Sequence, residues 1–93
     1  MNGYNLRVIE ERSMMSIMLF LLKNGTSRKM DLYENVSKSP RMAEKLDILQ
    51  DNGLIVMRKG PPTMVELTPT GLTISQHLSE IEDLLRTEKV QEP

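Results

Sequence analysis

The sequence predicts a mainly α-helical fold with one small β-hairpin, formed by a single domain over residues 1–93. Three observations lead to this prediction. Apolar residues recur at helical spacing in four segments. Two short apolar runs flank the turn-forming residues 60–63, Gly-Pro-Pro-Thr, as in a β-hairpin. A hydroxyl residue precedes proline in Ser39-Pro40 and again in Thr68-Pro69, which marks the starts of two helices.

The chain is organised around the helix predicted over residues 40–52. Ser39 can accept a backbone N–H as its N-cap, and Pro40 suits the first helical position because no donor is needed there. Gly53 ends the helix, since glycine takes the left-handed conformation without a steric penalty. The apolar stripe expected in the core consists of Met42, Leu46 and Leu49. The side chains left to face outward are Arg41, Glu44, Lys45, Asp47, Ile48 and Asp51.

A first helix is predicted from about residue 7 to residue 23, where Asn24-Gly25 closes it. Residues 1–6 before it carry no clear pattern and suggest a frayed end or a short strand. The inward stripe of this helix consists of Met14, Ile17, Met18, Leu21 and Leu22.

A second helix is predicted over residues 28–36, and two starts are open for it. The helix is capped by Thr26 or Ser27, or it starts later with a capping box of Asp31 and Glu34. Only residues 37–40 separate it from the next helix. A connection this short between two helices is typical of a helix-turn-helix.

The hairpin is predicted from strands over residues 54–59 and 64–67. Its tip, residues 58–64, extends outward and carries two cations and two prolines. A helix-turn-helix followed by such a hairpin is a winged helix-turn-helix, in which the hairpin is the wing. The predicted core of this fold covers about residues 7–68.

The last helix is predicted over about residues 69–87. Its apolar residues alternate at spacings of four, three and four, and this period near 3.5 suits packing against another helix. A domain of this size covers only the start of such a helix, so a second copy is expected on the outer half. The alternative is packing on the first helix of the same chain. The predicted homodimer interface consists of Ile74, Leu78, Ile81 and Leu85.

Charge is distributed unevenly along the chain. The net charge is −1, but residues 23–59 carry +3 and residues 60–93 carry −4. The basic third surrounds the helix over residues 40–52, which favours nucleic acid as the partner of that helix. The chain has no cysteine, so disulfides and thiolate zinc sites are excluded.

Five short motifs, in this order and spacing, carry a family resemblance: residues 32–36 (LYENV), 39–43 (SPRMA), 46–49 (LDIL), 52–55 (NGLI) and 67–71 (LTPTG). Over about residues 10–87 the chain resembles the prokaryotic winged-helix transcription regulators of the MarR and PadR-like kind. It is similar to their small members, archaeal ones among them, that lack a ligand domain. The resemblance implies a homodimer that places two recognition helices in successive major grooves of double-stranded DNA, with the wings beside them.

The residues predicted to contact DNA are cations of the basic third and one hydroxyl. Arg41 and Lys45 point to base edges or phosphates, and Ser39 offers its hydroxyl or the helix N-terminus to a phosphate. The other four cations hold the DNA backbone. The predicted set is Arg28, Lys29, Ser39, Arg41, Lys45, Arg58 and Lys59.

Two features depart from the family pattern. Lys38 stands in the turn where an apolar residue is usual. The outward face of the helix over residues 40–52 carries Glu44, Asp47 and Asp51, and carboxylates repel phosphates although they can accept from a cytosine amine. If these acids dominate that face, the alternative function is a winged-helix module that binds a protein and not DNA.

An enzyme is not predicted. His77 is the single histidine and has no partner at the spacing of a metal site or a catalytic triad. The glycines stand at turns and caps rather than in a phosphate-binding loop. No cofactor and no metal are expected, and no small-molecule effector is assigned. The longest apolar run, residues 14–22, is too short to span a bilayer, so a cytoplasmic protein is expected.

Overall fold

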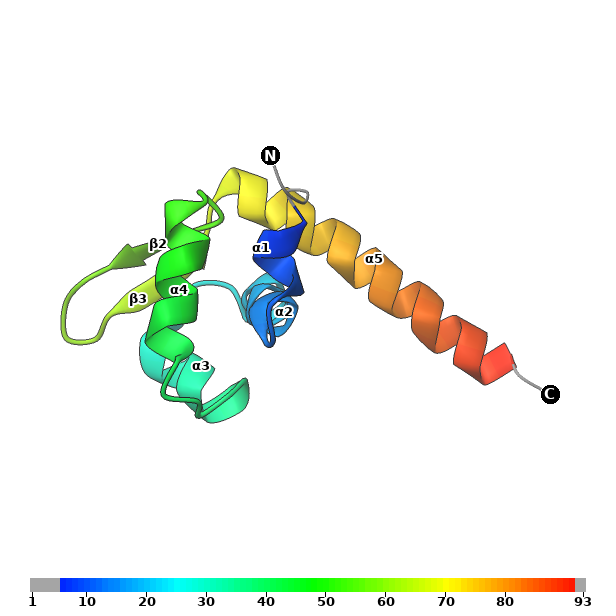
Figure 1. Cartoon of the computed structure of the whole chain (residues 1–93), viewed down its shortest axis with the longest axis horizontal. Helices are drawn as coiled ribbons and strands as arrows, with labels where there is room; N and C mark the ends of the chain where they lie inside the picture. The colour runs from blue at the N-terminus through cyan, green and yellow to red at the C-terminus, as the bar shows by residue number, and fades with distance from the viewer. Residues whose placement is uncertain (1–5, 92–93) are drawn as a thin grey trace.

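The computed structural model describes residues 6–91, and it describes side chains as far as residue 87. Helices and a small sheet form one body, from which the last helix extends as an arm (Figure 1). The predicted mainly α-helical fold with a wing and a C-terminal helix is confirmed. The expectation for residues 1–5 lies outside the described residues. In chain order the elements are α1 (Arg7–Glu10), α2 (Met14–Asn24), β1 (Ser27–Arg28), α3 (Lys29–Asn35), α4 (Met42–Asp51), β2 (Ile55–Arg58), β3 (Met64–Leu67) and α5 (Pro69–Gln91).

The first predicted helix is two helices, so the prediction of one continuous helix was wrong. The chain turns between α1 and α2 at Ser13, whose φ is 73°. Val8 and Ile9 of α1 pack against the core. In a continuous helix Val8 would stand about 180° around the axis from Ile17, on the side away from the core. The turn at Ser13 lets the partly buried Val8 and Ile9 of α1 contact the same core as the buried stripe of α2.

The sheet has three antiparallel strands in the order β1-β3-β2, and β1 was not predicted. Ser27 pairs with Val65, and its buried hydroxyl donates to the carbonyl oxygen of Gly25 (2.8 Å). Ser27 is therefore part of a strand, and neither it nor Thr26 caps the second helix. Asp31 does not start that helix either, because it is the third residue of α3. Its carboxylate accepts the backbone N–H of Arg28 (2.9 Å).

The core is built on α2, as its apolar stripe predicted, although Leu22 is only half-buried. The hairpin register is Ile55 opposite Leu67 and Arg58 opposite Met64. The buried apolar side chains are Met14, Ile17, Met18, Leu21, Leu32, Met42, Leu46, Leu49, Leu54, Ile55, Val65 and Leu78.

Helix α4 begins later than predicted and ends as predicted. The Ser39 hydroxyl accepts the backbone N–H of Arg41 (3.1 Å), and Arg41 is the N-cap in place of Ser39. The connection between α3 and α4 covers residues 36–41 and is therefore longer than the predicted residues 37–40. At the other end, Gly53 has a φ of 76° and Leu54 donates its backbone N–H to the Leu49 carbonyl oxygen (3.0 Å). This is a Schellman closure, which turns Leu54 back into the core.

The start of α5 is joined to the end of α4. Thr68 caps α5, since its Oγ1 accepts the backbone N–H of Gly71 (3.0 Å). The same hydroxyl donates to the carbonyl oxygen of Gly53 (2.6 Å). The backbone N–H of Thr68 also donates to Leu54 (3.1 Å). These bonds fix the hairpin and α5 relative to α4. The end of α4 and the start of α5 lie close together at the top of Figure 1.

Candidate nucleic-acid interface

The outward face of α4 is dominated by acids. Glu44, Asp47 and Asp51 are all exposed. At about 100° per residue they fall within about 60° of one another around the helix axis. Arg41 is the exposed cation beside them, at the start of the helix.

Lys45 does not belong to this face, so its predicted outward position was wrong. The residue is 7% exposed. It lies three residues after Met42 and four before Leu49, within about 60° of both around the axis. Its aliphatic stem therefore packs beside the buried stripe. Its amine forms no hydrogen bond or ion pair with any residue that the structure describes.

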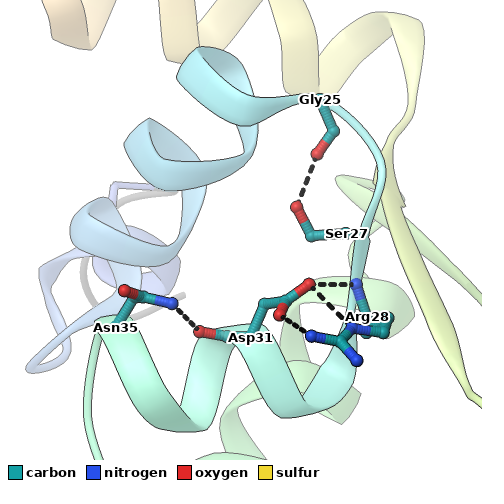
Figure 2. A network of polar contacts seen from close by, with 5 residues as sticks. All are labelled: Gly25, Ser27, Arg28, Asp31 and Asn35. Atoms are coloured by element: carbon teal, nitrogen blue, oxygen red, sulfur yellow. Dashed lines mark hydrogen bonds and ion pairs between the residues drawn. The ribbon is translucent and has the colours of Figure 1, made fainter.

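Each of the three arginines in the predicted site pairs with an acid of the same chain. Arg28 meets Asp31 through two donors, Nη2 (2.8 Å) and Nε (3.3 Å), as Figure 2 shows. Arg58 meets Glu66 of the neighbouring strand through Nε (3.3 Å) and Nη2 (3.5 Å). Arg41 meets Glu44 through Nε alone (3.0 Å).

Hydrogen bonds within these pairs shift the pKa values of Arg28, Asp31 and Arg41. The side-chain hydrogen bond from Arg28 lowers the pKa of Asp31, and the backbone N–H of Arg28 adds to the effect. The bond to Asp31 in turn raises the pKa of Arg28. The hydrogen bond to Glu44 raises the pKa of Arg41, and the charges of Glu44 and Glu11 act in the same direction.

The sheet brings two of the predicted cations together. Met64 of β3 stands opposite Arg28 on one side and Arg58 on the other. Residues directly opposite in antiparallel strands project to the same face, so both guanidinium groups belong to one face of the sheet. The bonds between Arg28 and Asp31 fix the start of α3 there, while Asn35 at the end of the helix donates to the Asp31 carbonyl oxygen (2.9 Å) (Figure 2).

Lys29 and Lys59 meet at a cleft between α3, α4 and the wing. The cleft has a volume of about 340 Å³ and is lined by Lys29, Asp47, Gln50, Met57, Lys59 and Thr63. The backbone N–H of Lys29 donates to Thr63 (2.8 Å), which ties α3 to the end of the wing turn. Two lysines and one aspartate are therefore among the residues that line the cleft.

Gln50 links α4 to the wing, a role that the sequence did not indicate. Its Oε1 accepts the backbone N–H of Met57 (2.7 Å) in β2, an edge strand of the sheet. The bond sets the wing against α4, which no local pattern indicates because the partners belong to different elements. Ser39, by contrast, is half-buried and its oxygen is already an acceptor for Arg41, as described above.

The predicted dimer seam divides into two halves. Leu78 is 9% exposed and belongs to the core of its own chain, and Ile74 packs against that core. Helix α5 contacts α2 of the same chain, which is the alternative that the sequence left open for this seam. Ile81 and Leu85 are 53% and 63% exposed, and Leu84 beside them is 66% exposed.

Other kinds of site find little support in residues 6–87. No group of three or more acidic, histidine or cysteine side chains there is placed to hold a metal ion. His77 is exposed and its Nδ1 lies 3.4 Å from Glu80 on the same helix. In the described part of the chain, no helix combines the length and the apolar character that a membrane crossing needs.

No protein-family model and no curated protein sequence matches the chain. Solved structures with the same fold include proteins described as transcription regulators. The transcriptional regulator homologue from Pyrococcus horikoshii OT3 aligns with a TM-score of 0.72 and 19% identity, over 89% of this chain and 89% of that one. A possible HxlR family transcriptional factor from Thermoplasma volcanium GSS1 aligns with a TM-score of 0.72 and 17% identity, over 95% of this chain and 84% of that one. A mutant of ZitR from Lactococcus lactis aligns with a TM-score of 0.65 and 20% identity, over 81% of this chain and 61% of that one. At these identities the likeness is one of fold, the winged helix.

Proposed function

We propose that the chain is a DNA-binding transcription regulator of the winged-helix kind, related to the MarR and PadR-like regulators. The likeness in fold to transcription regulators over most of the chain is the observation that carries this proposal. The proposal places α4 in the major groove and residues 58–64 of the wing on the backbone or in the minor groove. It assigns the protein no enzymatic activity, no cofactor and no effector, and it keeps the cytoplasm as its location.

The cations around α4 supply the contacts to the DNA backbone. Arg28 and Arg58 share one face of the sheet, and Lys29 and Lys59 line the cleft beside α4. Lysines serve this purpose as point charges that need no fixed geometry. Ser39 can donate its hydroxyl hydrogen to a phosphate while its oxygen accepts from Arg41.

The proposal includes a homodimer held by the outer half of α5. Ile81, Leu84 and Leu85 are exposed together at the end of the domain where α5 leaves the core. Burial of these side chains against the same helix of a second copy removes apolar surface from water. The dimer must then set its two α4 helices roughly 34 Å apart, one turn of DNA.

Binding to mixed-sequence duplex DNA at several salt concentrations tests the proposal. The logarithm of the affinity is expected to fall linearly with the logarithm of salt, by about 0.9 for each phosphate contact. Lys29→Ala and Lys59→Ala should each reduce that slope by about 1. A Glu80→Ala variant, on the exposed face of α5, should leave the slope unchanged.

A second function is favoured by one observation, the acids of α4. Glu44, Asp47 and Asp51 are exposed while Lys45 is not. An acidic face of this kind suits a basic protein surface. Absence of binding to any duplex at low salt would select this alternative, a winged-helix module that docks a protein partner.

A further inference from the structure

We infer that Arg41 reads a guanine in the major groove, and that Glu44 is the positioning residue that holds its guanidinium for this contact. The inference rests on the proposed DNA-binding function. It follows from which donors of each arginine are already engaged within the chain.

Arg41 has most of its donors free. A guanidinium carries five N–H donors, on Nε and on two terminal nitrogens. Arg41 uses only Nε, which donates to Glu44 Oε1 at 3.0 Å. Its terminal nitrogens have no partner among the described residues, and its side chain is 67% exposed.

The other two arginines of the interface are engaged differently. Arg28 and Arg58 each use Nε and Nη2 together on one carboxylate. Each therefore keeps only one terminal nitrogen wholly free. These side chains suit a single phosphate contact, whereas Arg41 can present two terminal nitrogens side by side.

Guanine offers the matching acceptors. Its O6 and N7 lie next to each other in the major groove, and bidentate arginine is the commonest specific contact to them. Because Nε of Arg41 donates to Glu44, the two terminal nitrogens, Nη1 and Nη2, are left to donate side by side to a base. Arg41 is also the N-cap of α4, and the N-terminal residues of a recognition helix are those that reach base edges.

Glu44 contributes in two ways. Its hydrogen bond restricts the rotamers of Arg41 before binding, so that less side-chain entropy is lost when the guanine contact forms. Its negative charge also makes the pair less attractive to a phosphate than a lone arginine would be. Both effects direct Arg41 towards a base.

Selection from a pool of duplexes with a randomised core tests the inference, using the full chain and its Arg41→Lys variant. Wild-type protein is expected to enrich a guanine at one fixed position in each half-site. Arg41→Lys keeps the charge and loses the planar pair of terminal nitrogens, so the enrichment of guanine at that position should fall well below that of the wild type. Arg58→Lys is the matched control, and its pool should keep the guanine. Enrichment of guanine in the Arg41→Lys pool that equals the wild-type enrichment overturns the inference.

A duplex with 7-deazaguanine at the enriched position gives an independent measurement, because this base lacks the N7 acceptor. Wild-type affinity should fall, by less than the roughly 150-fold upper value for a whole bidentate contact, because the O6 acceptor remains. Arg41→Lys should show no further loss on the same duplex. Equal wild-type affinity for both duplexes contradicts the contact.

Two variants of Glu44 test whether its hydrogen bond to Arg41 is needed for the guanine preference. Glu44→Gln keeps an oxygen that can accept from Nε, so preference for the guanine should survive. Glu44→Ala should lose that preference, while retaining binding to mixed-sequence DNA. Equal preference in both variants overturns the positioning role. Failure of the wild-type protein to bind any duplex at low salt instead overturns the proposed function itself.

Discussion

The backbone of Gly71, in the first turn of α5, lies directly against the carbonyl oxygen of Leu54 at the entrance to the wing. A Cβ built on Gly71 would overlap that oxygen, and it would also crowd the Leu67 side chain. The glycine in the motif LTPTG therefore has a physical reason. Helix α5 can approach the end of α4 this closely only where no side chain stands between them.

Gly71→Ala is therefore expected to lower the free energy of unfolding by about 1–3 kcal/mol, the usual cost of overpacking. Chemical denaturation measures it. Thr70→Ala, one residue earlier and exposed, is the control and should change stability by less than about 0.5 kcal/mol. Equal stability of Gly71→Ala and the wild type would contradict the close approach.

Thr68→Val should destabilise the domain by about 1–2 kcal/mol. The change keeps the shape of the side chain and removes both the cap for Gly71 and the donor to Gly53. Thr68→Ser retains the hydroxyl and should recover most of the loss. The midpoint of urea unfolding compares the three proteins, and a Ser variant as weak as the Val variant would refute the role of the hydroxyl.

Ser75→Ala should stabilise the protein by about 1 kcal/mol. Ser75 in α5 is fully buried, and its hydroxyl oxygen has no hydrogen-bond partner in the described structure. Removal of an unsatisfied buried group relieves its desolvation cost. Ser79→Ala, half-buried on the same helix, serves as the comparison. A loss of thermal stability in Ser75→Ala would mean that the hydroxyl has a partner.

The capping network of α3 should weaken in acid. The pKa of Asp31 is lowered in the folded chain, so the folded state binds this proton less readily than the unfolded chain. Its contribution is complete above the ordinary value of 3.8 and is lost as the pH falls through the lower folded pKa. Unfolding of the wild type should therefore depend more steeply on pH in this range than unfolding of Asp31→Asn. The same pH dependence of unfolding in the wild type and in Asp31→Asn would contradict a stabilising role of the Asp31 carboxylate.

Leu85→Glu should convert a dimer into a monomer, because it places a charge on the exposed apolar half of α5. Sedimentation of both proteins at equal concentration measures the mass. Gln76→Glu adds the same charge at an exposed position nearer the core and should leave the mass unchanged. A wild-type protein that is already monomeric would remove the dimer from the proposed function.

Much of the fold could be predicted because its signals are local. The bounds of β3 were predicted as observed, and the end of α4 was predicted from Gly53 alone. A left-handed residue, a hydroxyl cap and an apolar period of 3.6 all act within a few positions of the chain. The same local signals predicted which side chain, Thr68, begins α5.

The candidate site depended on contacts that span the chain. Strand β1 forms because Ser27 pairs with Val65, which is distant in the sequence. The turn at Ser13 allows Val8 and Ile9 to pack against the core. Lys45 and Leu78 are buried by neighbouring elements that no local pattern specifies. The sequence by itself determined the hairpin, the closure of α4 at Gly53 and the Thr68 cap of α5, since those follow from residues within a few positions of one another. Only the tertiary structure decided which charges face solvent and which arginine keeps its donors free, because burial and ion pairing depend on residues brought together by folding.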